Sequence, residues 1–349
     1  MKKKTVFVGM SGGVDSSVSA AILKDKGYDV VGVFIRTWHP DFIKCNEEEE
    51  RMDAMRVAVH LDIPFLTFDF EKEYKEGVAD YMIEEYKKGR TPNPDVMCNK
   101  EVKFGAFLNK ALEMGADYVA TGHYAQNIKN KLVKGKDESK DQSYFLWTLN
   151  KKQLEKIIFP VGHLNKTEVR KLAIKYKLPT AEKKDSQGIC FLGDIDLKDF
   201  LKHYIKTKIG KVLNEKGEEV GIHDGAVFST LGERHGFTIT KKTPNDKPYY
   251  VVSKDIEKNI LYVSQEKNVK DFNSNNEYII DNVNCLGEIK DKKPYTAQIR
   301  YHGEFLHCQV KILDKDKIEV IFKKPTLVAS GQSIVVYDKE FVLLGGVVI

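Results

Sequence analysis

The chain of 349 residues is long enough for two or three domains with buried cores. Hydrophobic residues make up 42% and charged residues 31%, which excludes a disordered chain, and no apolar stretch approaches the ~20 residues of a membrane span. The net charge of +5 is too small to indicate a partner by itself.

The N-terminus and the cysteines indicate the compartment. The apolar run that follows the basic start is short and broken by glycine, so it predicts a first strand and not a signal peptide. Five cysteines form no dense framework: Cys45, Cys98, Cys190, Cys285 and Cys308. This usage suits a reducing cytoplasm, where a cysteine is buried, binds a metal or is reactive.

Strands and helices alternate through the first 124 residues. The alternation predicts a parallel sheet covered on both faces, whose ligands bind beyond the carboxyl ends of its strands. The expected strands span residues 4–8, 28–36, 63–70 and 116–124. The expected helices span residues 16–26, 46–61 and 74–88, with a fourth that follows the loop GRTPNPDVMCN and ends near residue 114.

The pattern changes after residue 124. A polar hairpin is expected over 127–146, then helices over 151–158, 167–177 and 197–207, and beyond Gly210 short alternating strands typical of all-β modules. The polar stretch at 273–276 divides these strands in two. We therefore expect three parts: an α/β domain over 1–208, a small central β-rich module over 209–273 and a C-terminal β-barrel over 274–349.

Residues 151–208 are the most basic segment, with fourteen Lys and Arg against seven Asp and Glu. A basic segment in a nearly neutral protein indicates a polyanionic partner. A solvated lysine-rich surface explains the same count, and charge alone favours that second interpretation.

The stretch FVGMSGGVDSSVSA at 7–20 joins the first strand to the first helix through glycines and hydroxyls. Backbone N–H groups and the helix dipole at such a turn form an anion site. The lysine of a Walker A loop is absent, and the glycines do not fit the dinucleotide fingerprint. Asp15 would repel a bare phosphate but suits one that carries Mg²⁺. An ordinary glycine turn would not require so dense a cluster of serines.

The motif SGGVDS after a first strand resembles the PP-loop of the ATP pyrophosphatases, whose members cleave ATP between the α and β phosphates and adenylate a carbonyl oxygen. Further stretches closely resemble the tRNA-specific 2-thiouridylases, which place sulfur on C2 of the wobble uridine, U34. These are TGHYA (121–125), GRTPNPDVMCNKEVKFG (89–105), KDQSYFLWTL (140–149), FPVGHLNKTEVRKLA (159–173) and KDSQGICFLG (184–193). The resemblance runs along nearly the whole chain.

Exchange of oxygen for sulfur requires a leaving group, a sulfur nucleophile and a base, and ATP, cysteine and a carboxylate supply these. Asp95 and Cys98 lie three residues apart, while Cys190 lies 92 residues after Cys98, so only folding can bring it near. By resemblance, Cys190 carries a persulfide, Cys98 is the nucleophile and Asp95 is the general acid/base. Cys98 either frees sulfide from the persulfide or closes a disulfide with Cys190 after transfer. The alternative is that these three residues ligate a 4Fe–4S cluster; no other metal site is expected.

The resemblance also implies the ligand contacts. Asn93, Pro94 and Asp95 surround the target base. ATP, with Mg²⁺, contacts Gly9, Met10, Ser11, Gly12, Gly13, Val14, Asp15, Ser16, Ile35 and Gly122. The tRNA contacts His123, Lys140, Asp141, Gln142, Arg300, Tyr301 and Gln332, although a packing role is the alternative for His123.

The resemblance implies tRNAs for Lys, Glu and Gln as substrates, and a cysteine desulfurase or a sulfur-relay protein as donor to a monomeric enzyme. Three rivals remain at this point. A 2-thiocytidine synthetase would carry a C-x-x-C motif, and the chain has none. A small-molecule amidoligase would not need two remote cysteines, and a non-catalytic tRNA-binding protein would not need an intact Ser11–Ser17 cluster. The sequence departs from the family at Glu233 and His235 and lacks the usual proline before Gly331, which affects the expected tRNA contacts.

Overall fold

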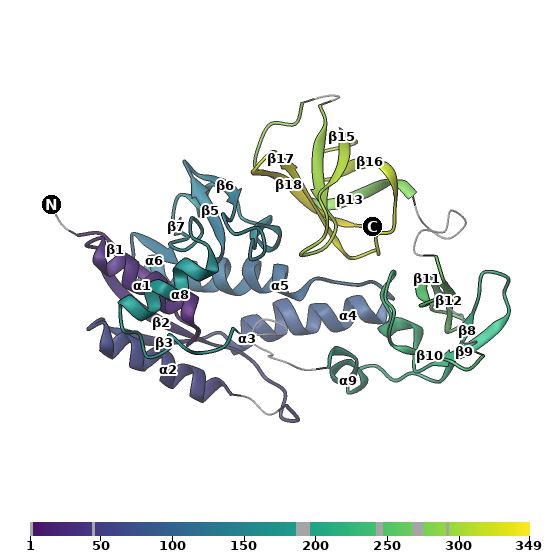
Figure 1. Cartoon of the computed structure of the whole chain (residues 1–349), viewed down its shortest axis with the longest axis horizontal. Helices are drawn as coiled ribbons and strands as arrows, with labels where there is room; N and C mark the ends of the chain where they lie inside the picture. Colours follow the sequence, from purple (N-terminus) through teal and green to yellow (C-terminus); the bar gives the residue numbers. More distant parts are fainter. Residues whose placement is uncertain (1–2, 44–45, 186–195, 242–246, 267–274, 291–292) are drawn as a thin grey trace.

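A computed structural model describes residues 3–43, 46–185, 196–241, 247–266, 275–290 and 293–349. The expected fold class is confirmed: an α/β domain is followed by a small β module and a closed β-barrel (Figure 1). Within the described residues, no helix is both long enough and apolar enough to cross a membrane.

The α/β domain is built on a five-stranded parallel sheet in the order β3-β2-β1-β4-β7. The central strand β1 is apolar at every interior position, because helices cover both of its faces. Val6 and Val8 pack toward α1, α2 and α8, whereas Phe7 packs toward the helices of the opposite face. The strands are β1 (Thr5–Gly9), β2 (Asp29–Arg36), β3 (Phe65–Asp69), β4 (Tyr118–Ala120) and β7 (Ile157–Ile158).

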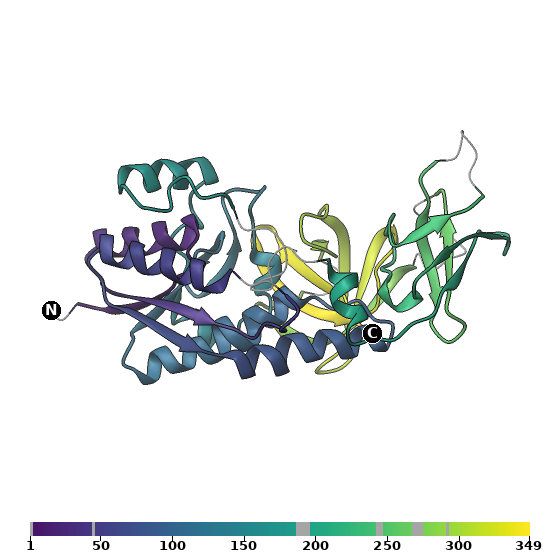
Figure 2. The same ribbon diagram turned by 90° about the horizontal axis from the view of Figure 1, so that it is seen from below.

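Helices on one face are α1 (Val14–Asp25), α2 (Glu47–His60) and α8 (Lys166–Lys175). The opposite face carries two long helices interrupted by π-helical turns, which run beneath the barrel (Figure 2). The first consists of α3 (Glu71–Tyr74), a π segment (Lys75–Asp80) and α4 (Tyr81–Lys87). The second consists of α5 (Pro94–Met97), a π segment (Cys98–Ala106) and α6 (Phe107–Glu113).

Two helix predictions need correction. The helix expected over 151–158 ends early: α7 (Lys151–Leu154) begins at a capping box on Asn150, and Ile157 and Ile158 then form β7 beside β4. The β-branched pair satisfies its backbone in the sheet, a tertiary interaction that helix periodicity does not show. The helix expected over 197–207 spans only α9 (Leu197–Lys202).

The two β modules differ in closure. The central sheet is open, in the order β10-β9-β8-β12-β11, whereas pairing of β13 with β18 closes the C-terminal sheet into a six-stranded barrel. The central module contains β8 (Gly210–Leu213), β9 (Glu219–His223), β10 (Phe237–Ile239), β11 (Tyr250–Asp255), β12 (Ile260–Ser264) and a 3₁₀ turn (Ala226–Phe228). The barrel contains β13 (Asn275–Cys285), β14 (Tyr295–Gln298), β15 (Leu306–Ile312), β16 (Ile318–Thr326), β17 (Ser333–Asp338) and β18 (Phe341–Val348).

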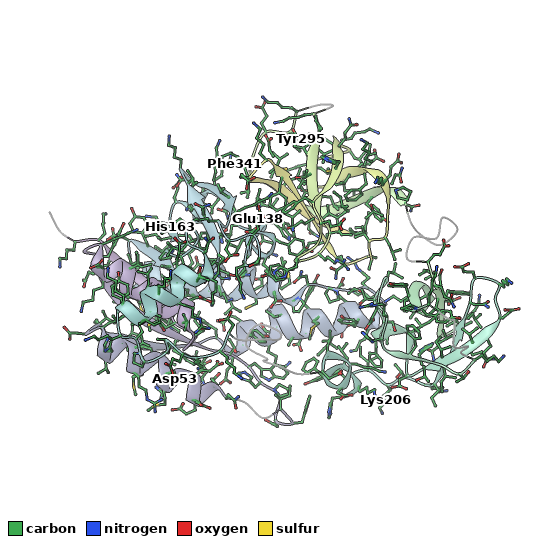
Figure 3. The ribbon with its side chains drawn as sticks, in the orientation of Figure 1. Asp53, Glu138, His163, Lys206, Tyr295 and Phe341 are labelled. Atoms are coloured by element: carbon green, nitrogen blue, oxygen red, sulfur yellow. The ribbon has the colours of Figure 1, made fainter. Side chains whose placement is uncertain are left out.

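The expected polar hairpin ties the α/β domain to the barrel. It forms β5 (Ala125–Ile128) and β6 (Lys131–Lys134), and Val133 of β6 pairs with Phe341 of β18. The backbone N–H of Lys134 donates to the carbonyl of Glu340 at 2.9 Å. Figure 3 shows Glu138 and Phe341 on this side of the molecule, where the hairpin meets the barrel. The barrel is therefore joined to the α/β domain by strand pairing.

Candidate active site

The loop between β1 and α1 has the geometry of an anion site. Gly12 has φ +71°, and a Cβ there would lie 2.4 Å from the carbonyl oxygen of Glu50, so only glycine fits. Gly13 is the N-cap, and its carbonyl accepts the hydroxyls of Ser16 at 3.2 Å and Ser17 at 2.7 Å. No side chain of the described residues caps α1. The first-turn N–H groups are therefore available to a ligand.

The other predicted nucleotide contacts lie around this loop. Gly122, just after β4, sits so close to α1 that a Cβ would lie 2.7 Å from the backbone nitrogen of Ser16. Met10 is buried, and its N–H donates to the carbonyl of Val33 at 2.8 Å. Ile35 is buried near the carboxyl end of β2, the strand next to β1. The structure thus brings the loop, β2 and the end of β4 to one edge of the sheet.

Asp15, in the first turn of α1, is held by two side chains that the sequence analysis did not identify. The ammonium of Lys166 lies 2.7 and 2.8 Å from its two carboxylate oxygens, and the hydroxyl of Tyr124 donates to one of them at 2.7 Å. Burial and the neighbouring Asp15 charge raise the pKa of Tyr124. Two signals were available in the sequence: Lys166 lies in the family-like stretch 159–173, and the pattern N-x-x-E at 165–168 is a capping box that places it first in a helix.

A second carboxylate extends this charge network. Asp185 receives Lys166 at 2.8 Å, Arg170 at 2.6 Å and Lys140 at 3.1 Å. Burial opposes ionisation of Asp185, but the hydrogen bonds and charges of Lys166 and Lys140 outweigh it and lower its pKa to about 2. Three cations therefore share two carboxylates beside the anion loop.

Asp95 and Cys98 lie on the first turns of a helix and not in a loop. Asn93 caps α5, its side chain accepting the N–H of Val96 at 3.3 Å, and Pro94 takes the first helical position. Residues three apart on a helix are neighbours on one face, which places Asp95 beside Cys98. Asp95 is half-buried, and Cys98 is fully buried and starts the π segment. Such π turns are frequent at functional sites.

The barrel reaches this helix through Tyr301. Its ring lies 4.5 Å from that of Phe145, whose carbonyl accepts the side-chain amide of Asn99 at 3.3 Å. Burial and the charges of Asp141 and Asp95 raise the pKa of Tyr301 to about 12. The predicted tRNA contact Tyr301 and the predicted acid/base Asp95 are therefore close enough to interact electrostatically, and Arg300 beside Tyr301 is exposed.

The loop before α5 is a junction of the three parts of the chain. The N–H of Thr91 donates to the carbonyl of Ser330 in the barrel at 2.8 Å, and the side-chain amide of Gln332 donates to the carbonyl of Thr91 at 2.9 Å. On the other side, the Thr91 hydroxyl meets that of Thr230 in the central module at 3.4 Å. The position of the Asp95 helix thus depends on both β modules.

Several predicted tRNA contacts have internal hydrogen bonds. His123 is buried between aromatic rings, its Nδ1 is 2.7 Å from the Thr121 hydroxyl, and burial lowers its pKa. Asp141 accepts the N–H groups of Gly135 and Ser143, and the Gln142 amide oxygen accepts the N–H of Tyr124. These are the contacts of positioning residues, and tRNA contact at these sites stays a prediction.

The predicted persulfide residue Cys190 lies outside the described residues, as does Cys45. Cys285 is exposed and Cys308 is buried in the barrel core, where burial raises its pKa to about 12. Cys308 is therefore a small buried hydrophobic residue of the barrel, and Cys285 is not. Among the described residues, no group of three His, Cys, Asp or Glu side chains is placed to hold a metal ion.

Comparison with known proteins identifies relatives of the whole chain. Family models match residues 4–194 (tRNA methyl transferase HUP domain), 198–265 (tRNA methyl transferase PRC-barrel domain) and 275–349 (aminomethyltransferase beta-barrel domain). The tRNA-specific 2-thiouridylase MnmA of Oceanobacillus iheyensis is 44% identical, over 99% of this chain and 95% of its own. The protein of that name from Shouchella clausii is 44% identical, over 100% and 98%.

Solved structures match more distantly. An NMN synthetase from Francisella tularensis is 16% identical with a TM-score of 0.34, over 53% of this chain and 66% of its own. The U34-tRNA thiolase NcsA from Methanococcus maripaludis, with its 4Fe–4S cluster, is 17% identical with a TM-score of 0.36, over 54% and 61%. Sequence identities and TM-scores this low do not indicate a shared function.

Proposed function

The chain belongs to the tRNA-specific 2-thiouridylase family, and we propose that it replaces the C2 oxygen of the wobble uridine with sulfur at the expense of ATP. The observation that carries the proposal is the placement of Asp95 and buried Cys98 on one capped helix, in the same domain as a glycine loop at the N-terminus of α1, which no side chain of the described residues caps. The enzyme is a tRNA-uridine 2-sulfurtransferase.

The first half-reaction activates the base. The loop Gly9–Ser16 would hold the phosphates of ATP while Ile35 and Gly122 border the nucleotide. The C2 oxygen attacks the α-phosphorus, the bond to the β-phosphate breaks, and pyrophosphate leaves. Asp95 takes the N3 proton, with Asn93 and Pro94 beside the base. Adenylation makes the C2 oxygen part of a good leaving group.

Mg²⁺ fits the donors at the loop. It is bound in proteins by one or two carboxylates together with substrate phosphates, and Asp15 supplies a carboxylate at the helix N-terminus. Mg²⁺ would neutralise phosphate charge. Asp15 keeps its hydrogen bond from Tyr124 and would orient toward the cation.

The second half-reaction transfers sulfur. The outer sulfur of a Cys190 persulfide attacks C2 and AMP leaves. Cys98 thiolate then attacks the Cys190 sulfur, which frees the thiocarbonyl and leaves a Cys98–Cys190 disulfide that a cellular dithiol reduces. In the alternative route, Cys98 attacks the Cys190 sulfur first and the sulfide released attacks C2. Both routes end with a Cys98–Cys190 disulfide. In both, either Cys98 must leave its buried position or Cys190 must reach it there.

The partners follow from this chemistry. We propose tRNAs for Lys, Glu and Gln as substrates, bound by the anticodon arm on the basic 151–208 segment and at Arg300 and Tyr301. A cysteine desulfurase or a relay protein would load Cys190 in the cytoplasm, and the enzyme would act as a monomer. The proposed domains remain 1–208, 209–273 and 274–349.

The test is thiolation of tRNA with ATP, Mg²⁺ and a persulfide donor, read as 2-thiouridine by mass of digested nucleosides. Wild type should form 2-thiouridine, while Cys98→Ser and Cys190→Ser should each lose it and retain tRNA-dependent release of pyrophosphate. Cys285→Ser is the matched control, since this exposed barrel cysteine lies outside the proposed site.

Two results would contradict the proposal. If wild type cleaves ATP but leaves every tRNA unchanged, the loop assignment stands and the substrate is wrong. If Cys98→Ser thiolates as wild type does, Cys98 is a packing residue. Bound iron that is lost in Cys98→Ser and required for thiolation would favour the cluster alternative.

A further inference from the structure

The anion loop lacks a lysine in its own sequence, yet a lysine from a distant helix lies against it. Lys166 is the first residue of α8, 151 positions after Asp15. Its ammonium is bound by both oxygens of Asp15 and by Asp185 at 2.8 Å, and only 14% of its side chain is exposed. The fold therefore places one cation at the mouth of α1, where a phosphate chain would lie.

The position of this ammonium is set by three contacts that are independent of nucleotide. Its helix packs on α1, with Val169 and Ala173 in the same core cluster as Val18. Asp137 accepts the backbone N–H of Lys166 at 2.8 Å and fixes the start of α8. The ring of Tyr124 lies 5.7 Å from the ammonium. A flexible lysine side chain on a rigid base can change partners without movement of the backbone.

When nucleotide binds, the charges at the site favour the transfer of the Lys166 ammonium from Asp15 to the phosphates. Without nucleotide, Lys166 neutralises the carboxylate that would otherwise repel phosphate at the loop. A nucleoside triphosphate brings several negative charges and its own divalent cation, and that cation can take the place of the ammonium on Asp15. Arg170 and Lys140 remain on Asp185, so this carboxylate stays paired when Lys166 leaves.

We propose that Lys166 is the phosphate-binding cation of this site: it leaves Asp15 to contact the β- and γ-phosphates of ATP and then the departing pyrophosphate. The inference deepens the proposed function, on which its role in turnover rests, because it assigns the residue that stabilises the leaving group. In the nucleotide-free site, Asp15 binds this ammonium and keeps it next to the position that the phosphates would occupy.

The experiment measures binding of inorganic pyrophosphate and of AMP by calorimetry, with no divalent cation, tRNA or sulfur donor. Lys166→Met should weaken pyrophosphate binding about tenfold or more, the scale of one charged hydrogen-bonding contact, and change AMP binding less than about twofold. Lys136→Gln is the matched control, because Lys136 pairs with Glu168 on the same first turn of α8 at 3.0 Å. It should bind both ligands as wild type does.

A second variant separates phosphate binding from simple charge compensation. Asp15→Asn releases Lys166, so it should bind pyrophosphate more tightly than wild type, and Lys166→Met in the same chain should abolish that gain. If the double variant binds as tightly as Asp15→Asn, Lys166 is only the counter-ion of Asp15 and the proposal is wrong. Equal losses of AMP and pyrophosphate in Lys166→Met would also overturn it.

The result can be read independently of the proposed function. Pyrophosphate binding requires neither tRNA nor sulfur, so a failure of thiolation would leave this measurement intact. If Lys166→Met alone does not fold, as shown by circular dichroism, the comparison of Asp15→Asn with the double variant decides, because neither of these leaves an unpaired Asp15 charge.

Discussion

The anion loop between β1 and α1 and the helix that carries Asp95 and Cys98 belong to one domain but are stabilised differently. The loop is formed by backbone: Gly12 and Gly13 shape it, and two serine hydroxyls bind it internally. The helix places a buried thiol, and its entry loop is hydrogen-bonded to the barrel through Thr91 and Gln332. The proposed ATP site is therefore formed within the α/β domain, around one turn, whereas the helix of the proposed sulfur site also has contacts with both β modules.

The largest effect should come from the turn itself. Gly12→Ala introduces a Cβ 2.4 Å from a backbone oxygen at φ +71°, where a side chain alone costs about 1–2 kcal/mol. The turn must shift, and its N–H groups then lose alignment. We expect ATP affinity to fall about a hundredfold, or roughly 2.7 kcal/mol, in a nucleotide titration.

A matched glycine tests the specificity of that effect. Gly27 has φ +85° but nothing within 4 Å of a Cβ, and it ends α1 at the opposite end from the loop. Gly27→Ala should lose a similar amount of conformational stability in urea and keep its ATP affinity. Equal loss of ATP affinity in both variants would show that overall stability, not the turn, controls binding.

The same contrast explains what sequence could and could not predict. The strand, glycines and serines of the loop are contiguous, so their pattern predicted an anion site with its donors. Asp95 and Cys98 were also identified, because their motif is local. Lys166 and Asp185 were missed, since their roles arise only when α8 packs on α1. The strand at Ile157 and Ile158 was missed for a similar reason: its pairing partner lies in β4.

A smaller effect should follow from the junction. Gln332→Ala removes the hydrogen bond to the Thr91 carbonyl, worth about 1 kcal/mol. Because this bond fixes the loop before α5, we expect the thiolation rate to fall severalfold while ATP affinity stays unchanged. Gln309→Ala, on an exposed position of β15, is the control and should alter neither. A loss of ATP affinity in Gln332→Ala would show that the junction with the barrel and the loop between β1 and α1 are coupled.

The smallest effect, and the most direct measure of how the barrel meets the sulfur helix, is the titration of Tyr301. Burial comes first among the causes that raise its pKa to about 12, and the charges of Asp141 and Asp95 add to it. An anionic carboxylate disfavours a phenolate beside it, so Asp95→Asn should lower this pKa by a fraction of a unit.

The measurement is ring-carbon NMR of labelled tyrosine between pH 9 and about 12.5, a range that includes the ordinary tyrosine pKa of about 10, with Tyr301→Phe to assign the signal. Asp69→Asn, on β3 in the α/β sheet, is the control, because Asp69 is not among the charges that act on Tyr301. An unchanged titration in Asp95→Asn would mean that the barrel does not sense the proposed acid/base group, and that tRNA contact at Tyr301 and chemistry at Asp95 are separate.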